Sequence, residues 1–263
     1  MEIIHLSDLH FGDSQAPFSE NELSDALSTY VVGKAENPIL ILSGDITVKG
    51  RIEGYEFATR FVENLIKNTG ISRHDLCFCP GNHDVVEGSF DAFSRFAYGA
   101  RRDRELDFTR DTYKKIVIQD TLFFIINSSF HLNHKFGLVD DKCFDEDLLE
   151  FEGMRKVIVF HHHILNQFDD DISAIRNAYD LVQFIERHSF SLALHGHQHT
   201  EQLYHLGRNT TPVISARSGN FNQTGFFNAF NHYKLVDDKI TMNSFAFERA
   251  KRSVKVRKIG EVN

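Results

Sequence analysis

Five short clusters of polar residues each follow an apolar run in this sequence, and their side chains are of the types that bind metal ions. In chain order the clusters are Asp8-Leu9-His10, Gly44-Asp45, Gly81-Asn82-His83-Asp84, His161-His162-His163 and Gly196-His197-Gln198-His199. Aspartate and asparagine supply oxygen ligands and histidine supplies nitrogen, in sufficient number to hold two ions. The clusters contain no cysteine, so we expect a site suited to Zn, Mn or Fe acting as Lewis acids rather than a structural thiolate site.

The predicted secondary structure places each cluster directly after a strand. Apolar runs bounded by turn residues predict strands at 2–6, 38–43, 76–80, 122–128, 156–160, 191–195 and 212–216, and alternating or β-branched runs predict strands at 230–236, 239–247 and 253–258. Apolar spacing of three and four predicts helices at 19–34, 53–68 and 172–188. Because loops converge and ligands bind at the carboxyl ends of strands in an α/β sheet, we expect the clusters to meet there.

The spacing within the clusters supports one shared site. Asp8 and His10 are two residues apart, as are His197 and His199, and on an extended segment each pair would point to the same side. Asp45 follows a glycine, which allows the backbone to approach its neighbours closely. The carboxylate of Asp45 is suited to bridging two cations, which lie roughly 3.5–4 Å apart in two-metal hydrolytic sites.

Composition and charge limit the classes of protein to which this chain can belong. The 263 residues carry a net charge of −8, so we expect no general electrostatic attraction to nucleic acid. The three cysteines, Cys77, Cys79 and Cys143, cannot all pair, and buried free thiols in a reducing compartment are the simplest account. No stretch approaches the length of a membrane span, and the N-terminus begins with a strand pattern rather than a signal sequence. These features predict a cytoplasmic protein without a membrane partner.

The chain is predicted to form a single domain over 1–263, with a helical or loop excursion at about 85–120. This region is irregular and includes the charge-dense run at 101–105. We interpret that run as a solvated face, and a cap that contacts substrate is the alternative.

Each cluster taken alone has a simpler interpretation. An Asp-x-His or Gly-Asp pair is most often a turn or a helix cap, and Gly-Asn-His-Asp is a favourable β-turn sequence. A triple histidine can be a surface accident. The argument for a dinuclear metal site therefore depends on all five clusters occurring together, each after a predicted strand.

The order and residue types of the clusters resemble the calcineurin-like metallophosphoesterase superfamily, whose pattern runs D-x-H, G-D, G-N-H-D/E, H, G-H-x-H. The resemblance spans residues 8–199 and implies an α/β fold, a two-sheet β-sandwich flanked by helices. It also implies two divalent or mixed-valence metal ions, with Mn, Fe and Zn as the candidates. The expected reaction is hydrolysis of a phosphoester by a metal-bound hydroxide that attacks phosphorus.

The resemblance also assigns roles to individual residues. It implies that the first metal is held by Asp8, His10 and His199, the second by Asn82, His161 and His197, and both by a bridging Asp45. It places His83 near the substrate phosphate, where it assists the leaving group, and Asp84 beside it, where a hydrogen bond would fix the imidazole of His83. Within the triplet His161 occupies the usual ligand position, and His162 is the alternative.

Three segments resemble the class III cyclic-nucleotide phosphodiesterase branch of the superfamily. They are Ile4–Gly12, Gly44–Thr47 with Gly54–Ala58, and Cys79–Val85. The histidine triplet also occurs there, although Ile164 replaces the usual proline. We therefore expect a small phosphodiester substrate, such as a 3′,5′-cyclic nucleotide. The alternatives are an Mre11-like nuclease, a phosphomonoesterase of the protein phosphatase type, and a catalytically silent binding scaffold. The acidic composition does not favour nucleic acid as the substrate.

Overall fold

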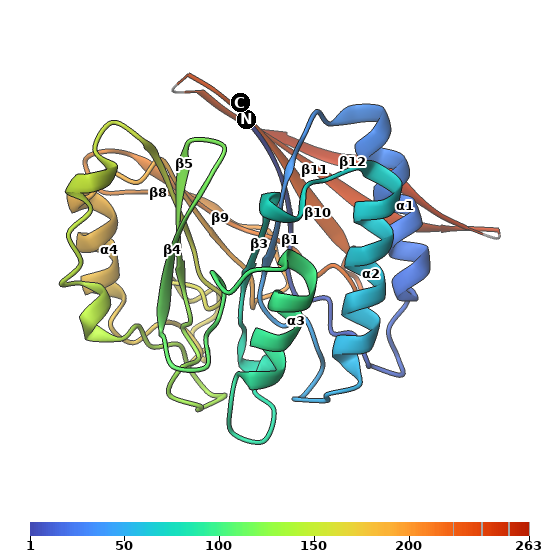
Figure 1. The fold of residues 1–263 in the computed structure, drawn as a ribbon, viewed down its shortest axis with the longest axis horizontal. Helices are drawn as coiled ribbons and strands as arrows, with labels where there is room; N and C mark the ends of the chain where they lie inside the picture. Colours follow the sequence, from blue (N-terminus) through green and yellow to red (C-terminus); the bar gives the residue numbers. More distant parts are fainter. Residues whose placement is uncertain (223, 238, 252, 263) are drawn as a thin grey trace.

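Runs of apolar residues form the central strands, which are largely buried, and the strands assemble into two mixed sheets with helices on their outer sides (Figure 1). The computed structural model describes residues 1–222, 224–237, 239–251 and 253–262. The predicted two-sheet α/β sandwich is confirmed.

The first sheet has the strand order β12-β11-β10-β1-β2-β3, and the second has the order β4-β5-β6-β7-β9-β8. The bounds in the first sheet are β1 Glu2–Leu6, β2 Ile39–Ser43, β3 Leu76–Cys79, β10 Ala229–Val236, β11 Lys239–Ala250 and β12 Ser253–Val262. In the second sheet they are β4 Tyr113–Ile118, β5 Thr121–Ile126, β6 Arg155–Val159, β7 Leu192–His195, β8 Leu203–Leu206 and β9 Thr211–Ser215. Strands β1, β2 and β3 are parallel to one another, as are β5, β6, β7 and β9. Their carboxyl ends form the edges that carry the polar clusters.

The helices cover the two outer sides of the sandwich. Their bounds are α1 Glu20–Lys34, α2 Gly54–Thr69, α3 Asp91–Arg101 and α4 Ala178–Arg187. Helices α1, α2 and α3 lie on the side of the first sheet and α4 on the side of the second (Figure 1). A capping box begins α1: the Ser19 hydroxyl accepts a hydrogen bond from the Glu22 N–H, and the Glu22 carboxylate accepts one from the Ser19 N–H. Among the described residues, no helix combines the length and the apolar character needed to cross a membrane.

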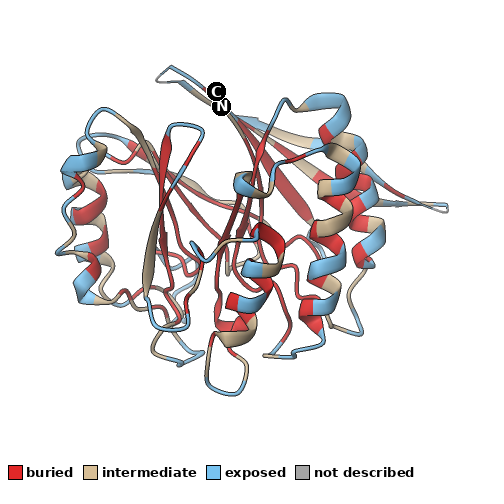
Figure 2. Ribbon diagram, in the orientation of Figure 1, coloured by how far each residue is buried: buried red, intermediate tan, exposed pale blue. Residues whose placement is uncertain are grey.

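The hydrophobic core lies between the sheets and beneath the helices. Buried residues line the central strands and the sheet-facing sides of the helices (Figure 2). The run Ile39–Leu42 and the run Leu122–Ile126 are almost wholly inaccessible to solvent. Near-continuous apolar strands of this kind are expected where both faces of a parallel sheet are covered. The three cysteines are buried and free, as predicted.

Two strands and one helix boundary differ from the sequence prediction. Strands β4 and β8 were not predicted, because polar residues such as Lys114 and His205 interrupt their apolar pattern. Helix α4 begins at Ala178 rather than at 172. The backbone before it is held in a loop, because the Ile175 N–H donates to the carbonyl of His163 at 2.9 Å and the Arg176 N–H to that of Gly137 at 2.9 Å.

The interpretation of the charge run at 101–105 as a solvated face is wrong for its first residue. Arg101 is buried at the end of α3, and its guanidinium donates to the carbonyls of His74 and Leu76 and to the carboxylates of Asp103 and Glu105. It ties the end of α3 to the start of β3. The region 85–120 as a whole contains α3 and β4.

The buried His5 on β1 makes the stability of the fold sensitive to acid. Its ring contacts the hydroxyls of Ser43 at 2.7 Å and Tyr233 at 3.4 Å. Burial lowers the pKa of His5 to about 3, and the neighbouring His195 adds to the effect. Below pH 6.5, His5 therefore binds a proton in the unfolded chain but not in the folded chain. As a result, the free energy of unfolding falls as the pH decreases from 6.5 toward 3.

We expect this one residue to remove about 2 kcal/mol of stability between pH 7 and pH 5. Urea unfolding at both pH values tests this with the wild-type protein and His5→Gln, which keeps a donor and an acceptor at the position. The variant should be less stable at pH 7 but lose less on acidification. An equal acid-induced loss in both proteins would show that His5 is not the cause.

Candidate metal centre

The five polar clusters come together between the carboxyl ends of the two sheets. Asp8 and His10 follow β1, Asp45 follows β2 and Asn82 follows β3, while His161 follows β6 and the pair His197 and His199 follows β7. Each sheet thus supplies part of the site. Gly44 allows the close approach that the sequence predicts: its φ is +98°, and a Cβ atom there would lie 2.4 Å from Nδ1 of His161.

Five of the predicted ligands have a left-handed backbone, which is uncommon for residues other than glycine. They are Asp8, His10, Asp45, His197 and His199, with φ values of 53°, 45°, 49°, 74° and 58°. The sequence prediction that Asp8 and His10 face one side is right, since Oδ1 of Asp8 lies 3.9 Å from Nε2 of His10, but the assumed extended segment is wrong. The same prediction is wrong for the other pair: His197 lies against His161, whereas His199 lies against Asp8. The pairs converge through left-handed turns that leave the strands.

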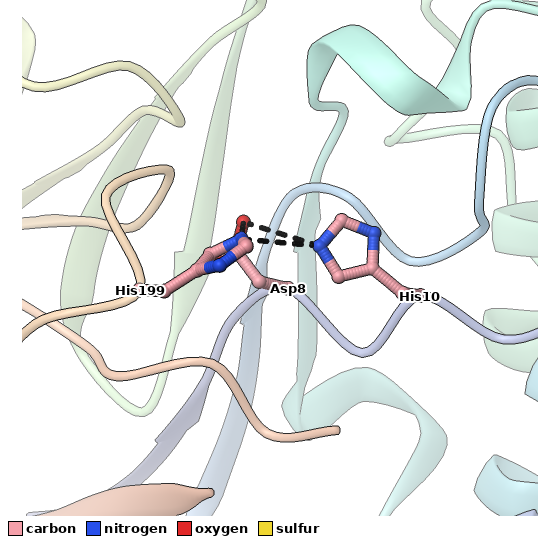
Figure 3. Close-up of side chains that lie close together, drawn as sticks. All are labelled: Asp8, His10 and His199. Carbon is pink, nitrogen blue, oxygen red and sulfur yellow. Dashed lines mark hydrogen bonds and ion pairs between the residues drawn. The ribbon is translucent and has the colours of Figure 1, made fainter. Parts of the chain in front are cut away.

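The first group of donors consists of Asp8, His10 and His199. The Nε2 atoms of His10 and His199 lie 3.2 Å apart, and Oδ1 of Asp8 lies 3.3 Å from Nε2 of His199 and 3.9 Å from Nε2 of His10. Figure 3 shows the three side chains pointing toward one another. Oδ1 of Asp8 is buried and makes no hydrogen bond to any described residue. The three donor atoms are therefore placed for a shared cation.

The second group consists of Asp45, Asn82, His161 and His197. Nε2 of His161 lies 3.2 Å from Oδ1 of Asn82, 3.2 Å from Nδ1 of His197 and 3.3 Å from Oδ2 of Asp45. Asp45 also lies close enough to His10 and His83 to form a third cluster of donors. It is thus the carboxylate that the two halves of the site share.

The histidine triplet divides into one site residue and two supporting residues. Nδ1 of His161 lies 2.8 Å from the carbonyl of Ser43, so in the neutral, metal-binding form of the ring Nδ1 carries the hydrogen and Nε2 presents its lone pair to the site. Nδ1 of His162 instead lies 2.8 Å from the hydroxyl of Ser128. The geometry therefore favours His161 over His162 as the ligand.

The buried carboxylates of the site favour the binding of additional positive charge. Burial opposes ionisation of Asp8 and Asp45, but His199 and His161 hold the pKa of Asp8 below its ordinary value, and His161 and His83 do the same for Asp45. Burial also opposes protonation of His161, yet the two carboxylates raise its pKa to about 9. The clusters contain no arginine or lysine to balance these buried carboxylates.

Two of the other imidazoles, His10 and His197, have the protonation state that metal ligands need, whereas at His199 the charge of Asp8 outweighs burial and raises the pKa. Burial lowers the pKa of His10 to about 4 and that of His197 to about 3, so both rings are neutral at pH 7 and offer a lone pair. Oxygen and imidazole donors in two adjoining groups, with a shared carboxylate, fit two divalent ions such as Mn, Fe or Zn.

Asp84 does not fix the imidazole of His83, so that prediction is corrected. Its carboxylate accepts hydrogen bonds from the backbone N–H groups of Gly81 at 2.9 Å, Thr47 at 3.0 Å and Ile46 at 3.2 Å. Burial and the charge of Asp45 raise the pKa of Asp84 to about 6, against the effect of these bonds. Asp84 therefore holds the short turn at 82–84 against the loop that carries Asp45.

The ring of His83 is oriented by the backbone instead. Nδ1 of His83 accepts a hydrogen bond from the Lys49 N–H at 3.1 Å, so the neutral ring carries its hydrogen on Nε2. Nε2 lies 4.0 Å from Oδ2 of Asp45 and thus faces the site. This arrangement directs an N–H donor toward a group bound beside Asp45.

Sequence reasoning missed a polar contact that fastens the loop at 164–172 to the ligand loop. Oδ2 of Asp171 lies 2.8 Å from Nε2 of His163 and accepts a hydrogen bond from Nε2 of Gln198 at 2.6 Å. Gln198 lies between the donors His197 and His199. Asp171 lies in an acidic run without periodicity, so no sequence signal distinguished it from a solvated residue.

We expect Asp171→Ala to weaken metal binding by about 10–100-fold, the usual effect of losing a residue that orients ligands. The cause is the freed Gln198, which no longer holds the left-handed ligand loop. Calorimetric titration with Mn measures the effect, with Asp169→Ala, an exposed residue of the same loop, as the matched control. Equal affinity in the two variants would contradict this role.

Comparison with known proteins agrees with the geometry. The sequence profile of the calcineurin-like phosphoesterase family matches residues 1–201. The chain belongs to this family. The calcineurin-like phosphoesterase fold seen here is similar to that of a dimetal phosphatase from Danio rerio, with 12% identity, 99% of each chain covered and a TM-score of 0.67.

A second solved structure shares this calcineurin-like phosphoesterase fold. It is GAP50, the anchor in the inner membrane complex of Plasmodium, with 11% identity, 100% of this chain and 89% of that chain covered, and a TM-score of 0.53. At these identities both likenesses show the fold alone. No curated protein matches the chain. The family and the donor set together support a metal-dependent phosphoesterase.

Proposed function

We propose that this phosphoesterase uses two metal ions to hydrolyse a small phosphodiester, such as a 3′,5′-cyclic nucleotide, in the cytoplasm. Asp8, His10 and His199 would hold one ion, Asn82, His161 and His197 would hold the other, and Asp45 would be shared by both. The observation that carries the proposal is the sharing of Asp45 between donor groups that come from different strands. The free, buried thiols support a reducing compartment.

The residues of the site have different roles in the proposed reaction. Two divalent ions, when bound, would supply Lewis acidity to a hydrolytic water and to the phosphoryl oxygens. Nε2–H of His83 donates to the departing ester oxygen as negative charge develops there. Asp84 keeps the turn that carries Asn82 and His83 in place. The Lys49 N–H keeps the hydrogen of His83 on Nε2.

The charge of the site supports a diester over a monoester. A diester brings one negative charge, while a monoester brings nearly two and needs additional cationic groups. The five clusters contain no arginine or lysine. The negative net charge likewise offers no track for a long polyanion, which disfavours the nuclease.

The proposal is tested by comparing kcat/KM for bis(p-nitrophenyl) phosphate, p-nitrophenyl phosphate and 3′,5′-cyclic AMP, with Mn, Zn and Fe supplied separately. We expect the diesters to be preferred with at least one metal. A clear preference for the monoester would overturn the choice of substrate. Rapid cutting of DNA with neglect of small diesters would favour a nuclease, and absence of hydrolysis with every metal would favour a binding scaffold.

A phosphomonoesterase is the second candidate, because of one arginine. Nε of Arg217 is buried and has no hydrogen-bond partner in the described part of the chain. Arg217 precedes Ser218, whose hydroxyl donates to the carbonyl of Asp8 at 2.7 Å. A monoesterase should lose kcat/KM in Arg217→Ala for p-nitrophenyl phosphate and not for the diester.

A further inference from the structure

Phe221 lies against the first group of donors and has no role in the chemistry described above. Its ring centroid lies 4.5 Å from that of His199 and 5.2 Å from that of His10. Phe221 retains some exposure to solvent, whereas His10 is buried. An aromatic ring therefore forms part of the wall beside the metal centre.

The loop that carries Phe221 is fastened to the metal centre itself. The Phe221 N–H donates to the hydroxyl of Ser218 at 2.9 Å and to Oδ1 of Asn228 at 2.9 Å. The same Ser218 hydroxyl donates to the carbonyl of Asp8 at 2.7 Å. The preceding Asn220 is held at both ends by the backbone of Phe18. The backbone at Phe221 is thus linked to that of Asp8 through the hydroxyl of Ser218.

Two more aromatic residues follow Phe221 in the sequence. Phe226 and Phe227 belong to the same loop and are 40% and 53% exposed. The flat face of the Phe221 ring favours an aromatic ligand group. Such a group gains more binding free energy from stacking than a small alkyl group of the same charge does.

We propose that Phe221 determines substrate specificity by holding an aromatic or heteroaromatic ester arm of the substrate. The proposal rests on the proposed function, because it requires a phosphoester bound between the two donor groups. An arm that leaves the phosphorus on the side of His10 and His199 meets the ring of Phe221. A nucleobase or an aryl group can stack on this ring, whereas a methyl or glyceryl group cannot.

The test measures binding, so it does not require that diesters be hydrolysed. Phenylphosphonate and methylphosphonate carry the same anionic group and differ in the arm. Calorimetry with Mn-loaded wild-type protein should show tighter binding of phenylphosphonate. Phe221→Ala should weaken phenylphosphonate about three- to tenfold and methylphosphonate less than about twofold, the range expected for one aromatic contact.

Two controls separate this role from a structural one. Phe221→Leu keeps apolar packing on His10 and His199, so it should retain both metals and still lose the preference for phenylphosphonate. Tyr179→Ala removes a 74%-exposed aromatic ring on α4 and should change neither affinity. Elemental analysis of each variant gives the metal content.

The proposal is overturned if wild-type protein binds both phosphonates equally, or if Phe221→Leu keeps the full preference. It is also overturned if the variants weaken both ligands to the same extent while retaining their metals. Failure of the diesterase function gives a different result, because a monoesterase would still show the selective loss of phenylphosphonate in Phe221→Ala.

Discussion

Replacing Asp45 by asparagine is expected to abolish hydrolysis and to empty or weaken both metal sites. Oδ2 of Asp45 lies 3.3 Å from Nε2 of His161, and the same carboxylate forms a donor cluster with His10 and His83. Asparagine has a similar shape but removes the charge and one of the two oxygens. Without that charge, the bridge between the two cations is lost. By contrast, His161→Ala should mainly reduce the occupancy of one metal.

Elemental analysis and kcat/KM for bis(p-nitrophenyl) phosphate measure these effects. Asp13→Asn makes the same chemical change in the loop that follows His10, and it should retain both metals and full activity. Circular dichroism of both variants monitors the fold. Two metals retained in Asp45→Asn would contradict the assignment of Asp45 as the bridge.

The second large effect is expected in His83→Ala, whose loss of activity should depend on the leaving group. The Lys49 N–H directs Nε2–H of His83 into the site. In the proposed reaction this N–H stabilises the charge on the departing oxygen. For diesters with poor alkyl leaving groups we expect a loss of about 10²–10⁴-fold in kcat. An activated aryl leaving group needs little help, so p-nitrophenyl esters should lose much less.

The matched variant for this prediction is His83→Gln, which retains an N–H donor and should recover part of the activity on alkyl esters. Equal losses on aryl and alkyl esters would point to a binding role for His83. Loss of a metal from His83→Ala would make it a ligand, since it lies near His10 and Asp45.

The part of the site that could be predicted from the sequence is the part that depends on strand order. Asp8, Asp45 and Asn82 follow three parallel, neighbouring strands, and His161 and His197 follow two more. Apolar runs reveal such strands, and the ends of parallel neighbours meet at one edge. The predicted convergence therefore needed only the pattern of strands and the polar residues after them.

The remaining features depend on packing that no local pattern encodes. The partners of Asp84 follow from the geometry of its turn, and the burial of Arg101 follows from how α3 meets β3. Asp171 and Phe221 lie in irregular loops, where periodicity carries no information. Their contacts with His163, Gln198 and His199 appear only after the sheets bring the loops together.

The left-handed backbone of five predicted ligands affects which substitutions are favourable at these positions during evolution. A non-glycine residue in that conformation costs about 1–2 kcal/mol, and two of these five also bury a carboxylate. Replacing such a ligand by glycine relieves strain and removes metal binding in one step. A gene copy no longer selected for hydrolysis would thus recover the backbone strain at each ligand that it replaces by glycine, while losing hydrogen bonds such as that from the His83 N–H to Oδ1 of Asp45.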